Sequence, residues 1–163
     1  MAASVEERFS YLKEWLIPYL KSKDAFERQI VEISDERFGI HVKYLSKDGF
    51  FIIEPKLSEL PEILSRIPAP PKSEFTAIFF NTKEKFKAAL ACWSELVKIR
   101  NLKMLFVNPE SETDTKWIVA PYVHTLICDE HSVSRGLRSM FSTVEPLTDA
   151  GVGKIVKKGV KSN

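Results

Sequence analysis

The sequence predicts one α/β domain, in which a single mixed β-sheet is flanked by helices. An amphipathic pattern opens the chain, period-two alternation surrounds Asp48-Gly49, and a helical pattern separates two short apolar runs. A length of 163 residues suits one domain. The chain is 44% hydrophobic and 28% charged, and no apolar run approaches the ~20 residues of a membrane-spanning helix. These values predict an ordinary globular protein.

Two helical patterns begin the chain. Residues 5–21 are predicted as a helix, because apolar side chains recur at helical spacing and Ser4 with Glu7 can form a capping box. Pro18 should kink or shorten this helix, because its ring removes a backbone hydrogen bond. A second helical stretch is predicted over residues 25–33.

A β-hairpin follows the helical patterns. Residues 38–44 alternate between apolar and polar side chains, and residues 50–54 form the returning strand. The Asp48-Gly49 dipeptide is typical of a hairpin turn. A short helix is then expected around residues 60–67, and the prolines from Pro68 to Pro71 end it.

The next segments predict a β-α-β unit. Residues 75–80 are almost entirely apolar, as in a strand buried on both faces. A helix from Lys83, capped by Asn81 or Thr82, leads to a second buried strand at residues 104–107. The two strands are expected to be parallel.

The C-terminal third is less regular. Residues 117–127 are apolar but contain Pro121, which favours an edge or bent strand. A helix is expected after Asp129. Periodicity is lost from about Leu147, so the sequence predicts a domain over residues 1–146 and a flexible basic tail over residues 147–163.

Charge and cysteine content restrict the function only weakly. The chain has 24 Lys and Arg against 22 Asp and Glu, a formal charge of +2. The net charge alone therefore does not indicate nucleic-acid binding, and only local clusters of charged residues can. Cys92 and Cys128 lack the spacing of a disulfide scaffold and are expected to be reduced thiols. The N-terminal residues do not resemble a secretory signal, so a cytoplasmic location is expected.

The order helix, hairpin, strand, helix, strand across about residues 5–127 resembles the PD-(D/E)XK nuclease fold, the restriction-endonuclease-like core. The resemblance implies an acidic residue on one strand and Asp/Glu-x-Lys on the next, which bind Mg²⁺ and position the attacking water. The motif can be assigned to this sequence in two ways, called here the first and second registers. In the first register these positions are Asp48 and Asn81-Thr82-Lys83. Asn81 is neutral where the family has an acid, which implies an inactive nuclease.

The second register places charged residues at all of the motif's charged positions. Glu54-Pro55-Lys56 then supplies the acidic-x-Lys motif, Asp35 is the upstream acid, and Glu7 or Glu27 could contribute from a helix. Each residue also has an ordinary structural interpretation. Asp48 suits a turn, Glu54 and Lys56 suit the solvated end of a strand, and Asn81 suits a helix cap.

A possible transition-metal site lies further along the chain. His124, Cys128 and His131 have side chains that bind Zn²⁺, Asp129 and Glu130 lie between them, and a fourth ligand such as His41 would have to come from elsewhere. The alternative is a buried cysteine with surface histidines. No cofactor is required by the sequence, and Mg²⁺ is implied only if the protein is a nuclease.

Basic residues concentrate near the C-terminus. The candidate nucleic-acid contacts are Lys154, Lys157, Lys158 and Lys161, with Arg135 and Arg138 on the preceding helix. Lysines near phosphates give a salt-sensitive attraction, although such termini can also serve only solubility.

The leading functional hypothesis is a non-catalytic or degenerate nuclease-like module that binds nucleic acid or docks onto a nucleic-acid-processing complex. One alternative is a Mg²⁺-dependent nuclease that uses Asp35, Glu54 and Lys56. Another is a protein-interaction or scaffold domain with exposed Trp15, Trp117 or Tyr122.

Overall fold

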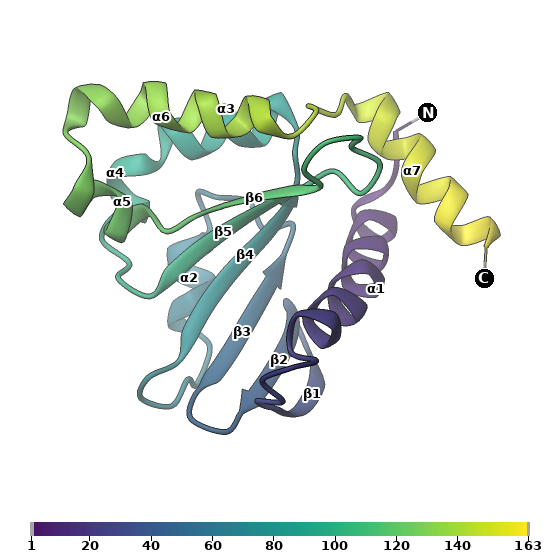
Figure 1. Cartoon of the computed structure of the whole chain (residues 1–163), viewed down its shortest axis with the longest axis horizontal. Coiled ribbons are helices and arrows are strands. Elements are labelled where there is room, and N and C mark those ends of the chain that lie inside the picture. The colour runs from purple at the N-terminus through teal and green to yellow at the C-terminus, as the bar shows by residue number, and fades with distance from the viewer. Residues whose placement is uncertain (1, 163) are drawn as a thin grey trace.

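A computed structural model of the chain, which describes residues 2–162, contains one six-stranded mixed sheet between two layers of helices (Figure 1). The predicted single α/β architecture is confirmed. The strands are β1 (Ile30–Glu36), β2 (Gly39–Tyr44), β3 (Asp48–Ile53), β4 (Glu74–Phe80), β5 (Leu102–Val107) and β6 (Lys116–Val119). The helices are α1 (Val5–Lys23), α2 (Leu60–Ser65), α3 (Lys83–Ala91), α4 (Trp93–Leu96), α5 (Pro121–Ile127), α6 (Glu130–Thr143) and α7 (Asp149–Lys161).

The spatial order of the strands follows their order in the chain. Strands β1, β2 and β3 form an antiparallel meander, β4 and β5 run parallel to β3, and β6 is antiparallel to β5. The predicted hairpin and the predicted parallel pair of buried strands are both confirmed. Among residues 2–162, no helix combines the length and apolar character needed to cross a membrane.

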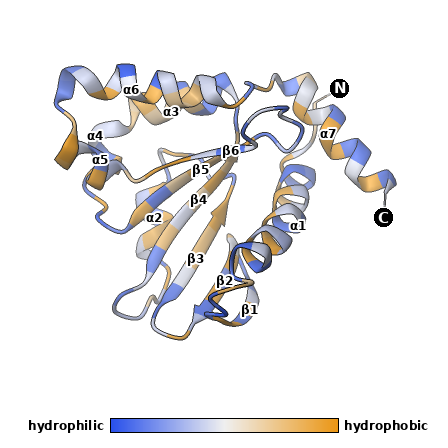
Figure 2. Ribbon diagram, in the orientation of Figure 1, coloured by the Kyte–Doolittle hydropathy of each residue, from blue (hydrophilic) through white to orange (hydrophobic). Residues whose placement is uncertain are grey.

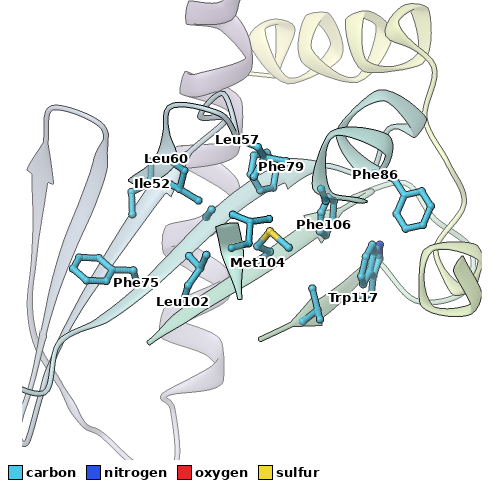
Figure 3. Close-up of a cluster of buried hydrophobic side chains, with 14 of the residues drawn as sticks. Ile52, Leu57, Leu60, Phe75, Phe79, Phe86, Leu102, Met104, Phe106 and Trp117 are labelled. Carbon is cyan, nitrogen blue, oxygen red and sulfur yellow. The ribbon is translucent and has the colours of Figure 1, made fainter. Parts of the chain in front are cut away.

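Each face of the sheet carries its own core. One core contains Phe79, Phe106 and Trp117 and is covered by α2, α3 and α6 (Figures 1 and 3). The other contains Ile78 and Phe80 and is covered by α1 and α7. Successive side chains of a strand point to opposite faces, which is why strands this apolar fit between two layers. Figure 2 accordingly shows mainly apolar central strands and helices with mixed hydropathy.

Side chains cap several helices as the sequence predicts. Ser4 and Glu7 form the expected capping box at α1, and the Thr82 hydroxyl accepts a hydrogen bond from the backbone N–H of Lys85 at α3. Asp129 caps α6 in the same way. These oxygens satisfy backbone amides that have no partner within the helix.

The predicted helix over residues 25–33 is wrong. Strand β1 begins at Ile30, and the Asp24 carboxylate accepts hydrogen bonds from the backbone N–H groups of Gln29 and Ile30. Phe26, which the helical pattern would bury, is 98% exposed. Pairing with β2 and the β-branched side chains of this segment favour the strand.

The hairpin turn is displaced from its predicted position. Asp48 and Gly49 belong to β3 and lie opposite Lys43 and Val42, while residues 45–47 make the turn. A hydrogen bond from Tyr44 N to Lys47 O closes this turn at 2.9 Å. The side chain of Asp48 therefore belongs to the sheet.

Both prolines that were expected to disturb regular structure lie in helices. Helix α1 continues through Pro18 to Lys23. Strand β6 is an edge strand, as expected, but it ends at Val119 and Pro121 begins α5, so the predicted strand is wrong over residues 121–127. Pro121 is suited to the first turn of α5, where the missing N–H of proline would have no partner.

The segment predicted as an irregular tail forms helix α7. Val152, Ile155 and Val156 are buried against the α1 side of the sheet, and Arg8 of α1 forms a 2.8 Å ion pair with Asp149. The predicted loss of periodicity from Leu147 is therefore wrong. Helix α7 is part of the packed domain.

Asn81, just beyond β4, is a fully buried polar residue that joins several elements. Its side-chain oxygen accepts a 2.8 Å hydrogen bond from Trp117 Nε1, and its side-chain nitrogen donates to Val144 O at 3.1 Å. Its backbone carbonyl accepts a bond from Leu147 N. The predicted alternative that Asn81 caps α3 is wrong, because Thr82 does so.

We expect Asn81→Asp to destabilise the protein by about 3 kcal/mol at pH 7, because a buried carboxylate would replace the donor to carbonyl oxygens. Burial raises the pKa of the new carboxyl group, so the variant should recover stability as pH falls and that group is protonated. Urea unfolding at pH 7 and pH 4.5 measures both effects.

The control is Asn101→Asp. Asn101 is exposed and donates one hydrogen bond to Ser73 O, so the expected loss is less than about 1 kcal/mol. Equal losses for the two variants would contradict the role of Asn81.

Candidate functional site

The residues of the second nuclease register do not converge. Asp35 lies on β1 and pairs with Lys13 of α1 at 2.7 Å. In the sheet Asp35 aligns with Ile40, which aligns with Phe51, whereas Glu54 lies three residues beyond Phe51. Strand geometry thus separates the two acidic positions by roughly 14 Å.

The Glu54 side chain is only 6% exposed and binds protein groups. It accepts a 2.9 Å hydrogen bond from Phe80 N, and Lys85 Nζ lies 3.6 Å from its second oxygen. Lys85 also donates to Pro55 O. Glu54 therefore ties the end of β3 to β4 and α3.

The remaining members of this register lie apart from Glu54. Lys56 is 77% exposed and pairs with Glu59, so it points away from the buried carboxylate. Glu7 is occupied in the α1 capping box, and Glu27 is exposed in the segment before β1.

The first register places its residues at opposite ends of the sheet. Asp48 begins β3, whereas Asn81 follows the end of β4, and these two strands are parallel. Gly49 lies opposite Glu74, seven positions before Asn81, which corresponds to roughly 23 Å along the strand. Lys83 is exposed in the first turn of α3.

Asp48 instead forms a pair that the sequence analysis did not anticipate. Its Oδ1 lies 2.7 Å from Nε2 of His41 on β2, and both side chains are about one-fifth exposed, at 20% and 23%. The His41 ring also stacks on Phe50 with 4.5 Å between ring centroids. The carboxylate and the aromatic ring together fix the orientation of the imidazole.

The three metal-ligand candidates do not form a ligand set. His124 lies in α5 with its ring nearly perpendicular to that of Trp93, Cys128 ends that helix, and His131 is exposed in α6. Within residues 2–162, no three His, Cys, Asp or Glu side chains are placed to hold a metal ion. Cys92 and Cys128 are free thiols.

The predicted nucleic-acid contacts separate into two groups. Lys154, Lys157, Lys158 and Lys161 occupy the exposed side of α7, opposite its buried face. Arg135 and Arg138 are exposed on α6, which packs on the other face of the sheet. The arginines therefore do not extend the lysine stripe of α7, which is defined here as its four exposed lysines.

The three aromatic residues proposed as a protein-binding surface have different environments. Trp117 is 6% exposed and bonded to Asn81, so it belongs to the core. Trp15 stacks on Tyr19 at 4.9 Å, and the Arg100 guanidinium lies over Tyr122. Together they form no continuous aromatic surface.

A polar pocket beside the end of α1 was also not anticipated. It encloses about 360 Å³, and Glu74 lies between Lys47 at 3.0 Å and Lys103 at 3.6 Å. Burial opposes ionisation of Glu74, but bonds from Lys47 and the charge of Lys103 lower its pKa overall. Burial, with the nearby charges of Asp24 and Glu74, raises the pKa of Tyr44 to about 12.

Comparisons with known proteins do not assign this chain to a family. The chain matches no protein-family model, and searches of curated proteins and of solved structures gave no significant match. Any assignment of function therefore depends on the geometry of its own side chains.

We expect Glu54→Ala to cost about 3 kcal/mol of unfolding free energy, because it leaves Phe80 N without its acceptor and Lys85 without its carboxylate partner. Glu54→Gln keeps an acceptor and should cost less. Chemical denaturation of both variants tests this. Lys56→Ala is the control from the same motif, with an expected change within about 0.5 kcal/mol. A neutral Glu54→Ala substitution would contradict the anchoring role.

The raised pKa of Tyr44 predicts a loss of stability in strong alkali. The folded state favours the protonated phenol, so this contribution is present below the unfolded pKa of about 10 and is lost as pH rises toward 12. Tyr44→Phe should flatten the fall in stability between pH 10 and 12 in thermal melts. An unchanged pH profile would contradict this assignment.

Proposed function

We propose that this protein is a non-catalytic, nuclease-like module that binds nucleic-acid phosphates through the lysine stripe of α7. The single observation that carries the proposal is the presence of four lysines on one exposed helical face. Lys154, Lys157, Lys158 and Lys161 follow the i, i+3, i+4, i+7 spacing that lines one side of a helix.

The rigid placement of the stripe supports this proposal. The opposite side of α7 is buried against the sheet, and Arg8–Asp149 ties the helix to α1. One lysine, Lys158, is paired with Glu110 at 3.0 Å, but that carboxylate is half exposed. Phosphates could therefore compete for Lys158, while a helix held in place presents the lysines together.

The non-catalytic part of the proposal is supported by the dispersed acidic residues. Glu54 is engaged by Phe80 and Lys85, and Asp35 by Lys13, on separate parts of the sheet. The resemblance to the PD-(D/E)XK fold implies an acidic cluster, and neither register brings its residues together. A mixed sheet with helices on both faces is the feature of the fold that supports keeping the resemblance in this proposal.

Charge substitution is the appropriate test, because deletion of α7 would also remove Val152, Ile155 and Val156 from the core. We expect the triple variant K154Q/K157Q/K161Q to weaken binding to labelled DNA or RNA about tenfold at low salt. The slope of log affinity against log salt should fall by roughly 2 to 3, about one per lost phosphate contact. Glutamine has nearly the helix propensity of lysine, so α7 should remain folded.

The matched control removes three exposed lysines on the other helical layer, as K83Q/K87Q/K98Q. The control should retain the affinity and salt slope of the parent protein. Equal weakening by the two triples would contradict a site on α7, and failure of the parent to bind either nucleic acid would contradict nucleic-acid binding. Cleavage that requires Mg²⁺ and Glu54 would contradict the non-catalytic assignment.

A further inference from the structure

A second pocket lies near the β1–β2 end of the strand order, whereas α7 packs on the face of the sheet that α1 covers. It encloses about 400 Å³ between the turn joining β1 to β2, the face of β3 and the segment from Arg66 to Pro70. Its volume lies within the range of small-molecule sites. The walls combine apolar surface from Phe38, Phe50 and Ile67 with a few charged side chains.

The charged side chains of this pocket are mainly basic. Arg37 and Arg66 both line it, and Glu36 is the acidic side chain in the lining. Arg66 pairs with Glu62 on the exposed surface of α2, whereas the guanidinium of Arg37 lies 5.2 Å from the centre of the Phe38 ring. Two guanidinium groups present flat arrays of donors that match the oxygens of a phosphate group.

His41 adds an oriented polar group to the same pocket. Its Nε2 faces Asp48 at 2.7 Å, and its ring lies flat on Phe50. When Nε2–H donates to Asp48, the neutral ring offers Nδ1 as an acceptor, and the protonated ring offers it as a donor. The ring can thus bond either to a hydroxyl group or to an anionic oxygen of a ligand.

We propose that this pocket binds a small organic phosphate, a phosphate monoester with an apolar or aromatic body such as a nucleoside monophosphate. Arg37 and Arg66 hold the phosphate, the apolar wall around Phe38 packs against the body, and His41 contributes a directed hydrogen bond. The pocket shares no residue with the lysine stripe of α7. The proposal is therefore independent of nucleic-acid binding by that helix.

Calorimetric titration of the full chain with adenosine monophosphate, phenyl phosphate, adenosine and inorganic phosphate tests the proposal. We expect at least one of the two phosphate monoesters to bind, and to bind at least tenfold more tightly than inorganic phosphate or adenosine. R37Q/R66Q should weaken that binding at least tenfold. Both arginines are exposed, so this variant should fold as the parent does.

Two further variants locate the site. His41→Phe preserves a ring on Phe50 but removes the nitrogens, and it should weaken monoester binding about fivefold while a thermal melt verifies the fold. The α7 variant K154Q/K157Q/K161Q should bind the monoester as the parent does. Loss of binding in the α7 variant, unchanged binding in R37Q/R66Q, or no binding of either monoester by the parent would each overturn the proposal.

Discussion

The hydrogen bonds of two buried asparagines at the ends of β4 and β5 hold the two helical layers on one sheet. Asn81 binds Trp117 and Val144, and the Asn108 side chain donates to Glu145 O at 2.8 Å. Residues 144–147 carry the chain from α6, on one face, to α7, on the other. The chain passes the ends of β4 and β5 here, and carbonyl groups that face the sheet need donors. A side-chain amide can donate to a carbonyl and accept from an indole at once, which a carboxylate cannot do.

The strongly periodic segments could be predicted from the sequence, and the exceptions have physical causes. Local sequence patterns alone were enough to predict the apolar strands β4 and β5 and the capped start of α1. In α7, three glycines hide the helical period, yet a Cβ at Gly159 would lie 2.8 Å from the Tyr11 ring. Close packing against α1 therefore requires a residue that weakens the helical signal. In β1, pairing with β2 overrode the helical pattern predicted over residues 25–33.

The four lysines of α7 could be named from the sequence, whereas the contacts around His41 and Glu54 were harder to predict because they depend on register across strands. Asp48 and His41 are seven residues apart and become diagonal neighbours once Lys43 is paired with Asp48 and His41 with Phe50. A turn at residues 45–47 gives this pairing, whereas a turn at Asp48-Gly49 excludes it. The buried Glu54–Lys85 contact needs a parallel alignment of β3 with β4, which no local sequence pattern specifies. The pocket beside His41 draws on three separate segments, so it emerges only from the tertiary structure.

The packing of α7 has a consequence for the order in which the protein is made. Residues 149–161 supply Val152, Ile155 and Val156 to a core that also contains Leu12 and Leu16 of α1. During synthesis, the apolar side of the sheet beside α1 stays partly uncovered until the ribosome has released this helix. Nascent chains that expose such a surface are prone to aggregation and to capture by chaperones. A chain that lacks α7 would therefore expose the apolar surface beside α1, and it would be lost to protein quality control as well as lacking the four lysines.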